Sequence, residues 1–168
     1  MSEFSRIYDG ARLPAVPQQL NASDAERAEL AERFDLVAVK SLSATVELAA
    51  DGQTVRATGR LQAAIVQSCA VSGEDLAVKI NEPIALHFVP ATNLSVSETE
   101  IELDAAELDE IEMDGTRFDL GEAVAQTLAL AIDPYLEGPG AKEARGKAGI
   151  VSEAAAGPFA ALKGLLKD

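Results

Sequence analysis

The sequence has few of the residues from which catalytic and metal sites are usually built. It contains one cysteine (Cys69), one histidine (His87) and no tryptophan. A single cysteine excludes an intramolecular disulfide, which fits a reducing compartment. A structural zinc site needs about four ligands, often in paired Cys-x-x-Cys units. Here Ser72 stands where the second cysteine of such a unit would be. We therefore expect no metal site and no histidine-based triad.

Long hydrophobic runs are also missing. No apolar stretch approaches the ~20 residues that span a bilayer, and the N-terminal residues show no basic cluster followed by an apolar core. The sequence has neither a Gly-rich phosphate-binding loop nor a Gly-x-Ser-x-Gly nucleophile elbow. These absences predict a cytoplasmic protein without cofactors that is not an enzyme.

Cys69 has three interpretations: a nucleophile, a metal ligand or a buried small side chain. A Cys–His pair needs both side chains on the same side of a sheet. Cys69 continues the apolar phase of its predicted strand, whereas His87 falls in the opposite phase to Leu86 and Phe88. Free cysteines are among the most buried residues and pack as small hydrophobes. We expect Cys69 to be buried and inert.

The sequence is rich in acids, and they are unevenly distributed. The net charge is −14, and the segment from Glu98 to Glu122 holds eleven acids against one base. The segment lacks the alternating acids of an EF-hand calcium loop. It is either a solvated surface or a docking surface for a basic protein, because such a charge repels polyanions. The docking hypothesis assigns partner binding to Glu98, Glu100, Glu102, Asp104, Glu107, Asp109, Glu110, Glu112 and Asp114, with Phe159 and Leu162 from the C-terminal segment.

Hydrophobic periodicity predicts an α+β fold. Ser23 and Glu26 form a capping box at the start of a helix, and Asp119 with Glu122 starts a second helix in the stretch 119–134, which Pro134 ends. Between them, alternating apolar residues predict strands over residues 41–48, 55–69 and 76–88, with a hairpin at Asp51-Gly52. Shorter strands are expected around Ile101 and Met113. The prediction is an antiparallel β-meander sheet, or a half-open barrel, packed with two to three helices.

The domain prediction divides the chain into three parts. Residues 1–137 form a single α+β domain, residues 138–157 a flexible Gly/Ala-rich linker, and residues 158–168 a short C-terminal helix. That helix either binds a partner or packs back onto its own domain, and the sequence leaves both open.

Several motifs resemble those of the YceD-like family of bacterial large ribosomal RNA subunit accumulation proteins, in particular its alphaproteobacterial branch. They are "GRLQAAIVQSCAVSGEDL", "DLGEAVAQTLALAIDPY" and the terminal "GPFAALKGLLK". Cys69, Gly73 and Phe159 lie in these family motifs. Many members carry a second cysteine where this chain has Ser72, and the usual Leu-Glu-Pro turn is replaced by Gly73-Glu-Asp.

The resemblance implies a non-catalytic factor in biogenesis of the large ribosomal subunit that supports accumulation or processing of its RNA. With the charge, it suggests a basic ribosomal protein or assembly factor as partner and an indirect association with the RNA. No membrane or DNA binding is implied. The alternative is a small-ligand-binding β module with an apolar interior, which the low aromatic content (4%) permits.

Overall fold

The computed structural model describes residues 3–91 and 109–149 of the chain. These residues fall into two compact units. The larger unit comprises the residues up to Gln67 together with Ala77–Ile132, and the smaller unit comprises Ser68–Leu76 and the residues from Asp133 onward. The predicted C-terminal helix over residues 158–168 lies outside the described residues.

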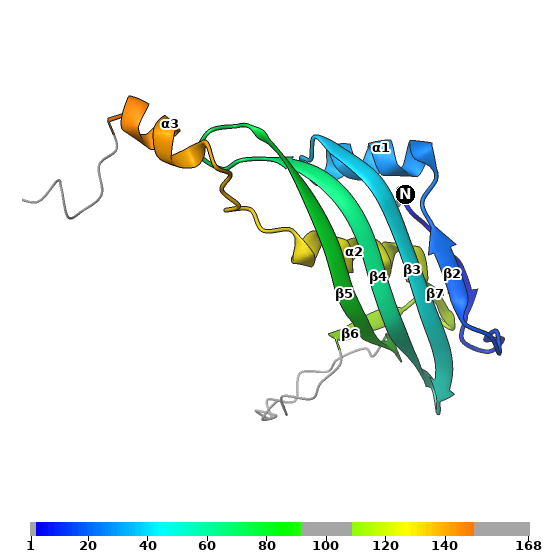
Figure 1. The fold of residues 1–168 in the computed structure, drawn as a ribbon. Coiled ribbons are helices and arrows are strands. Elements are labelled where there is room, and N and C mark those ends of the chain that lie inside the picture. Colours follow the sequence, from blue (N-terminus) through cyan, green and yellow to red (C-terminus); the bar gives the residue numbers. More distant parts are fainter. Residues whose placement is uncertain (1–2, 92–108, 150–168) are drawn as a thin grey trace, which may run out of the picture. The chain divides into compact units, whose positions relative to one another are not determined.

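Three long antiparallel strands form the centre of the sheet: β3 (Ala38–Asp51), β4 (Thr54–Ser68) and β5 (Asp75–Pro90). Asp51 pairs with Thr54 across the first hairpin, which leaves Gly52 and Gln53 as its turn. Gly52 has a φ of 64°, a conformation that glycine adopts without steric strain. The predicted meander and its Asp-Gly hairpin are therefore confirmed (Figure 1).

The two edges of the sheet differ in direction. β2 (Gln18–Asn21) pairs antiparallel with β3, whereas β6 (Asp109–Met113) pairs parallel with β5. A parallel neighbour needs a connection of about a dozen residues or more, and residues 91–108 provide it. In the described residues no pairing joins β2 to β6, so the sheet is open. The sequence predicted a strand at Met113 but not its parallel direction.

Two further short strands, β1 (Ile7–Asp9) and β7 (Arg117–Asp119), form an antiparallel pair of their own. β7 follows β6 through a tight turn at Gly115, in which Asp114 and Arg117 exchange backbone hydrogen bonds of 2.9 and 3.0 Å. β7 leads directly into the second helix, so this turn places the helix start beside the N-terminal strand.

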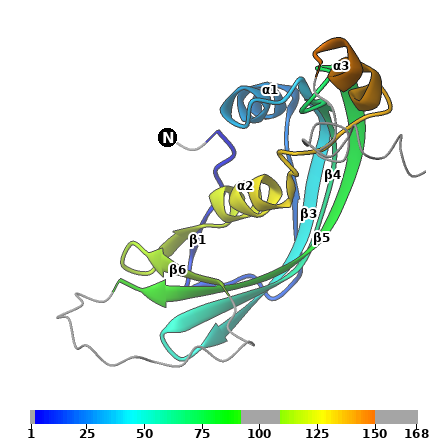
Figure 2. The same cartoon turned by 90° about the vertical axis from the view of Figure 1, so that its left-hand side faces the viewer.

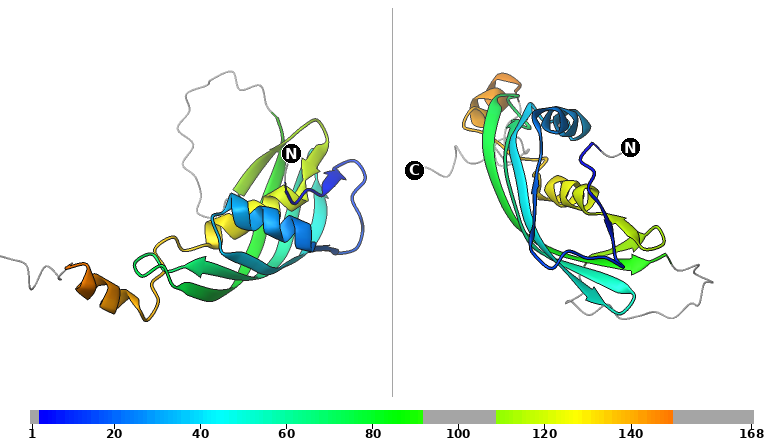
Figure 3. Two further views of the ribbon diagram at one scale, coloured as in Figure 1. Left: turned by 90° about the horizontal axis from the view of Figure 1, so that it is seen from above. Right: turned by 90° about the vertical axis from the view of Figure 1, so that its right-hand side faces the viewer.

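Both predicted helices are present, and both lie on the concave face of the curved sheet (Figures 2 and 3). Helix α1 (Asp24–Arg33) begins with the predicted capping box between Ser23 and Glu26. Helix α2 (Leu120–Ala131) begins at Asp119, whose carboxylate accepts the Glu122 N–H. Each cap satisfies an N–H group that has no partner within the helix.

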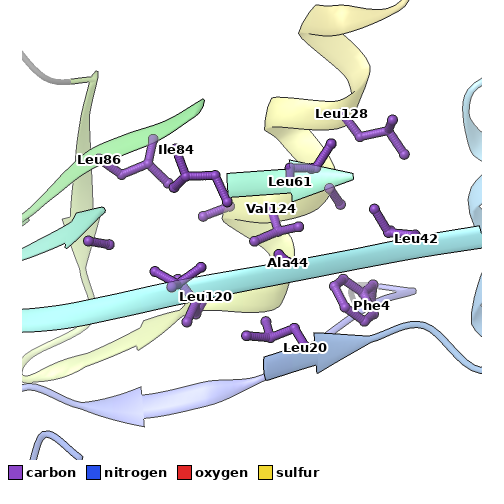
Figure 4. Close-up of a cluster of buried hydrophobic side chains, with 14 of the residues drawn as sticks. Phe4, Leu20, Leu42, Ala44, Leu61, Ile84, Leu86, Leu120, Val124 and Leu128 are labelled. Atoms are coloured by element: carbon purple, nitrogen blue, oxygen red, sulfur yellow. The ribbon is translucent and has the colours of Figure 1, made fainter. Parts of the chain in front are cut away.

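Helix α2 and the sheet enclose the hydrophobic core of the larger unit (Figure 4). Leu120, Val124 and Leu128, which are spaced four residues apart, are fully buried. They share the core with alternate residues of the strands, including Leu42, Ala44, Leu61, Ile84 and Leu86. The two periodicities, four in the helix and two in the strands, place all of these side chains in one layer.

The smaller unit contains a helix that the domain prediction did not include. Helix α3 (Ala141–Lys147) lies within the segment expected to be a flexible linker. Its alanines favour a helix, and Glu143 and Lys147 form an ion pair one turn apart, at 2.6 Å. The Gly/Ala composition that suggested flexibility therefore includes a helical part.

Candidate functional site

The Cys69 turn, defined here as Ser68–Leu76, lies in the smaller unit and connects β4 to β5. The Cys69 N–H donates to the Glu74 carbonyl oxygen at 2.7 Å, and the Gly73 N–H donates to the Cys69 carbonyl oxygen at 3.0 Å. Gly73 has a φ of 73°, which residues with a Cβ adopt only with strain. This requirement gives a physical reason for glycine at position 73.

The Cys69 thiol lies among backbone N–H groups. Its Sγ accepts hydrogen bonds from the amides of Ser72 (3.3 Å) and Val71 (3.5 Å) within the turn. It also accepts one from Gly138, at 3.3 Å, sixty-nine residues further along the chain. The side chain is free of disulfide bonds and only 4% exposed. Burial of Cys69 was predicted and is confirmed.

These donors change the acidity of the thiol. The pKa of Cys69 is lowered to about 7, chiefly by the Gly138 N–H and then by the hydroxyl and the amide of Ser72. Hydrogen bonds to the charged form of a group favour that form. The thiolate form is therefore more populated near neutral pH than that of an ordinary cysteine. That Cys69 is inert stays a prediction, because a thiolate is nucleophilic only where a reagent can reach it.

Glu74 and the "EGPG" segment, residues 137–140, complete the surroundings of the thiol. The Gly140 N–H donates to Glu74 Oε1 at 2.9 Å, and the Ala70 N–H donates to the Leu136 carbonyl oxygen at 2.9 Å. A Cβ at Gly138 would lie 2.1 Å from Glu74 Oε1. The turn and residues 136–140 are thus joined by backbone N–H groups that donate to two side chains of the turn and to one carbonyl oxygen. The domain prediction assigned residues 138–140 to a linker. Two glycines close together, Gly138 and Gly140, were the visible signal of a close backbone approach.

The single histidine has a different environment. His87 Nε2 lies 2.9 Å from Thr54 Oγ1 in the larger unit, and His87 is not among the hydrogen-bond partners of the Cys69 thiol. Within residues 3–91 and 109–149, no group of three or more His, Cys, Asp or Glu side chains is arranged to hold a metal ion. The hydrogen bonds around Cys69 join two chain segments, Ser68–Leu76 and residues 136–140.

The described part of the predicted docking residues, Glu98–Asp114, is β6 and the turn residue Asp114. Asp109, Glu110, Glu112 and Asp114 form no ion pair with any residue in the part of the chain that the structure describes. Their exposed carboxylates lie along an edge strand of the sheet. The other predicted partner-binding residues lie outside the described residues, namely Glu98, Glu100, Glu102, Asp104, Glu107, Phe159 and Leu162.

The family model for the large ribosomal RNA subunit accumulation protein YceD matches residues 57–166, well over half of the chain. The chain belongs to this family. The matched range includes the Cys69 turn, β6, helix α2 and Phe159, so it covers the motifs that carried the resemblance. No curated protein and no solved structure matches the chain. Among the helices of the described residues, none combines the length and hydrophobicity of a membrane-spanning segment.

Membership of the YceD family connects the chain to accumulation of large-subunit ribosomal RNA. The residues matched by the family model include two features described above, the Cys69 turn and strand β6. The hydrogen bonds of the Cys69 turn are internal, and the exposed acids of β6 form no ion pair within the described residues.

Proposed function

We propose that this YceD-family protein is a non-catalytic factor in large ribosomal subunit biogenesis that acts in the cytoplasm. It supports the accumulation or processing of the large-subunit ribosomal RNA through a basic protein, either a ribosomal protein or an assembly factor. The observation that carries the proposal is the family match over residues 57–166. The partner docks on the acidic segment Glu98–Asp114.

The charge distribution supports a protein partner over direct RNA binding. The chain has a net charge of −14, and RNA affinity rests largely on neutralising phosphates with Lys and Arg. On β6, Glu110 and Glu112 are exposed and without ion pairs among the described residues. Unpaired surface carboxylates attract cationic proteins and accelerate their association, and salt screens this effect.

The alternative function, a small ligand in an apolar interior, has less support. The space between the sheet and α2 is filled by Leu61, Leu120, Val124 and Leu128, all of which are fully buried. Close-packed interiors leave few voids larger than a water molecule.

A charge-neutralising variant tests the proposal in cells. The variant Glu110→Gln/Glu112→Gln/Asp114→Asn removes three charges from β6 and its turn. The matched control Glu29→Gln/Glu32→Gln/Asp35→Asn removes three exposed charges near α1 that form no ion pair with any described residue. We expect deletion of the gene to lower the ratio of large-subunit to small-subunit RNA. The control should restore the ratio fully and the β6 variant only in part.

A second measurement concerns the partner itself. The tagged full-length protein should retain a basic ribosomal protein or assembly factor after RNase treatment and release it as the salt concentration rises. An unchanged RNA ratio in the deletion strain would contradict the proposed function. Retention of ribosomal RNA after ribosomal proteins have been stripped would contradict the indirect association.

A further inference from the structure

Three turns of the larger unit converge on one cavity of about 380 Å³. Each turn contains an Asp-Gly dipeptide: Asp9-Gly10 after β1, Asp51-Gly52 between β3 and β4, and Asp114-Gly115 between β6 and β7. All three glycines line the cavity, although they are far apart in sequence. Apolar side chains of Val55, Pro90 and Met113 complete the lining.

The glycines make backbone groups part of the cavity wall. Gly52 and Gly115 have positive φ values of 64° and 65°, and a Cβ on either would meet no atom within 4 Å. At Gly10 a Cβ would lie 3.2 Å from Val55 Cγ2 and 3.3 Å from the Thr116 carbonyl oxygen. The wall at Gly10 is therefore closely packed, whereas the other two turns leave open space.

The lining indicates what the cavity accepts. It contains apolar side chains, backbone groups, and the polar side chains of Gln53, Thr54 and Thr116, but no charged side chain. Thr54 is held in place, because its hydroxyl donates to the Asp51 carbonyl oxygen at 2.7 Å and lies 2.9 Å from His87 Nε2. With no charged side chain in its lining, the cavity favours a neutral apolar group, and its volume of about 380 Å³ has room for one leucine-sized side chain.

Some of the acids around the cavity have basic neighbours, and others form no ion pair among the described residues. Asp51 is paired with Arg56 at 3.1 Å. Asp9 lies opposite Arg117 in the β1–β7 pairing. The pKa of Asp9 is lowered first by the hydrogen bond from the Ala11 N–H, at 2.9 Å, and further by the positive charges of Arg117 and Arg12. The acids of β6 and its turn have no such match in the described residues. They are Asp109, Glu110, Glu112 and Asp114. Met113, which lies between two of them, is part of the cavity lining.

We propose that this cavity receives one apolar side chain from a basic segment of the partner protein, while the Lys and Arg residues beside it contact the β6 carboxylates. The inference rests on the proposed function for the existence of a basic partner and adds its mode of recognition. Charge complementarity selects the segment, and the apolar side chain fixes its position. A surface of acids alone would accept any cation, whereas the cavity selects for a leucine-like or methionine-like residue between the bases.

The test uses the purified full-length protein, labelled with ¹⁵N, and two synthetic peptides of equal charge. Each peptide has three Lys or Arg residues on either side of a central position, which is leucine in one peptide and glycine in the other. Burial of a leucine side chain predicts at least about tenfold tighter binding of the leucine peptide. The amide signals of Gly52, Thr54 and Gly115 should shift with the leucine peptide and much less with the glycine peptide.

Two variants test whether the peptide binds in the cavity. Gln53→Trp introduces an indole at its rim and should remove the preference for leucine. Gln62→Trp introduces the same group at an exposed position of β4 away from the lining, and it should leave the preference unchanged. If Gln53→Trp changes the NMR spectrum of the folded protein, Thr116→Phe is used in its place, because it fills the cavity from another turn.

The possible results separate the two proposals. Equal affinity for both peptides, absence of binding, or shifts away from the three turns would overturn the role of the cavity, whatever the RNA ratio in cells. A tenfold preference that maps to the cavity, found together with a normal RNA ratio in the deletion strain, would overturn the proposed function and leave the cavity as a peptide site.

Discussion

Replacing Gly121 by alanine should destabilise the larger unit, although alanine is normally the better helix former. Gly121 lies in the first turn of α2, where the N-terminal segment crosses the helix. A Cβ at this position would lie 2.3 Å from the Phe4 carbonyl oxygen and 2.8 Å from the Arg6 nitrogen. Both neighbours are backbone atoms, so no rotation of a side chain can relieve the overlap.

The size of the destabilisation can be worked out from the contacts of the N-terminal segment, which must shift to make room for the Cβ. The N-terminal segment is held by the Arg6 N–H on Asp119 Oδ1 (2.8 Å) and by the Leu120 N–H on the Arg6 carbonyl oxygen (2.9 Å). Each such bond contributes about 1 kcal/mol. Phe4 is fully buried, and its burial contributes about 1.5–3 kcal/mol. Weakening these contacts outweighs the roughly 1 kcal/mol by which alanine is favoured in helices. We expect a net loss of about 3 kcal/mol in the free energy of unfolding.

Circular dichroism is the suitable assay, because the chain has no tryptophan for fluorescence. A loss of this size should lower Tm by roughly 6–12 °C. Gly146→Ala in α3 is the control, since a Cβ there meets no atom within 4 Å, and it should not lower Tm. If Gly121→Ala unfolded within about 0.5 kcal/mol of the wild type, a difference typical of neutral surface substitutions, the crossing would not be as tight as described.

Three further predictions concern other contacts. Gly59→Ala should lower the urea midpoint strongly, because a Cβ on Gly59 would lie 1.9 Å from the Thr45 carbonyl oxygen; an unchanged midpoint would contradict this. The pKa of Glu26 is lowered to about 2, first by the hydrogen bond from Arg6. The stabilisation by the ionised Glu26 carboxylate is thus complete above about pH 4.5 and is lost as the pH falls through 2. The stability difference between the wild type and Glu26→Gln should shrink over that range in denaturant titrations, and a constant difference would refute the pairing. The pKa of Cys69 is lowered from 9.0 to about 7. The contribution of the Cys69 thiolate to the free energy of unfolding is therefore complete above pH 9 and is lost as the pH falls through 7. Under reducing conditions, the wild type should lose its advantage over Cys69→Ala between pH 9 and 6. An advantage that grows in acid would show that the thiol rather than the thiolate is preferred.

Much of the candidate partner surface was visible in composition alone. The excess of acids and the resemblance to the YceD family both came from the sequence, and the family match confirms the resemblance. The cavity was not visible, because Gly10, Gly52 and Gly115 belong to three separate turns. The position of Gly138 beside Cys69 was hidden for the same reason.

The sequence by itself determined the elements whose causes are local. The capping box of α1, the Asp-Gly hairpin and the alternation in β3 to β5 depend on residues a few positions apart, and the structure contains all of them. Only the tertiary structure decided the parallel direction of β6, the pairing of β1 with β7, and the hydrogen bond from Gly138 to the thiol. These features join residues that are distant in the chain. Periodicity and propensity act over a few residues and cannot specify which distant segments meet, because that choice is made by burial and hydrogen bonding of the whole unit.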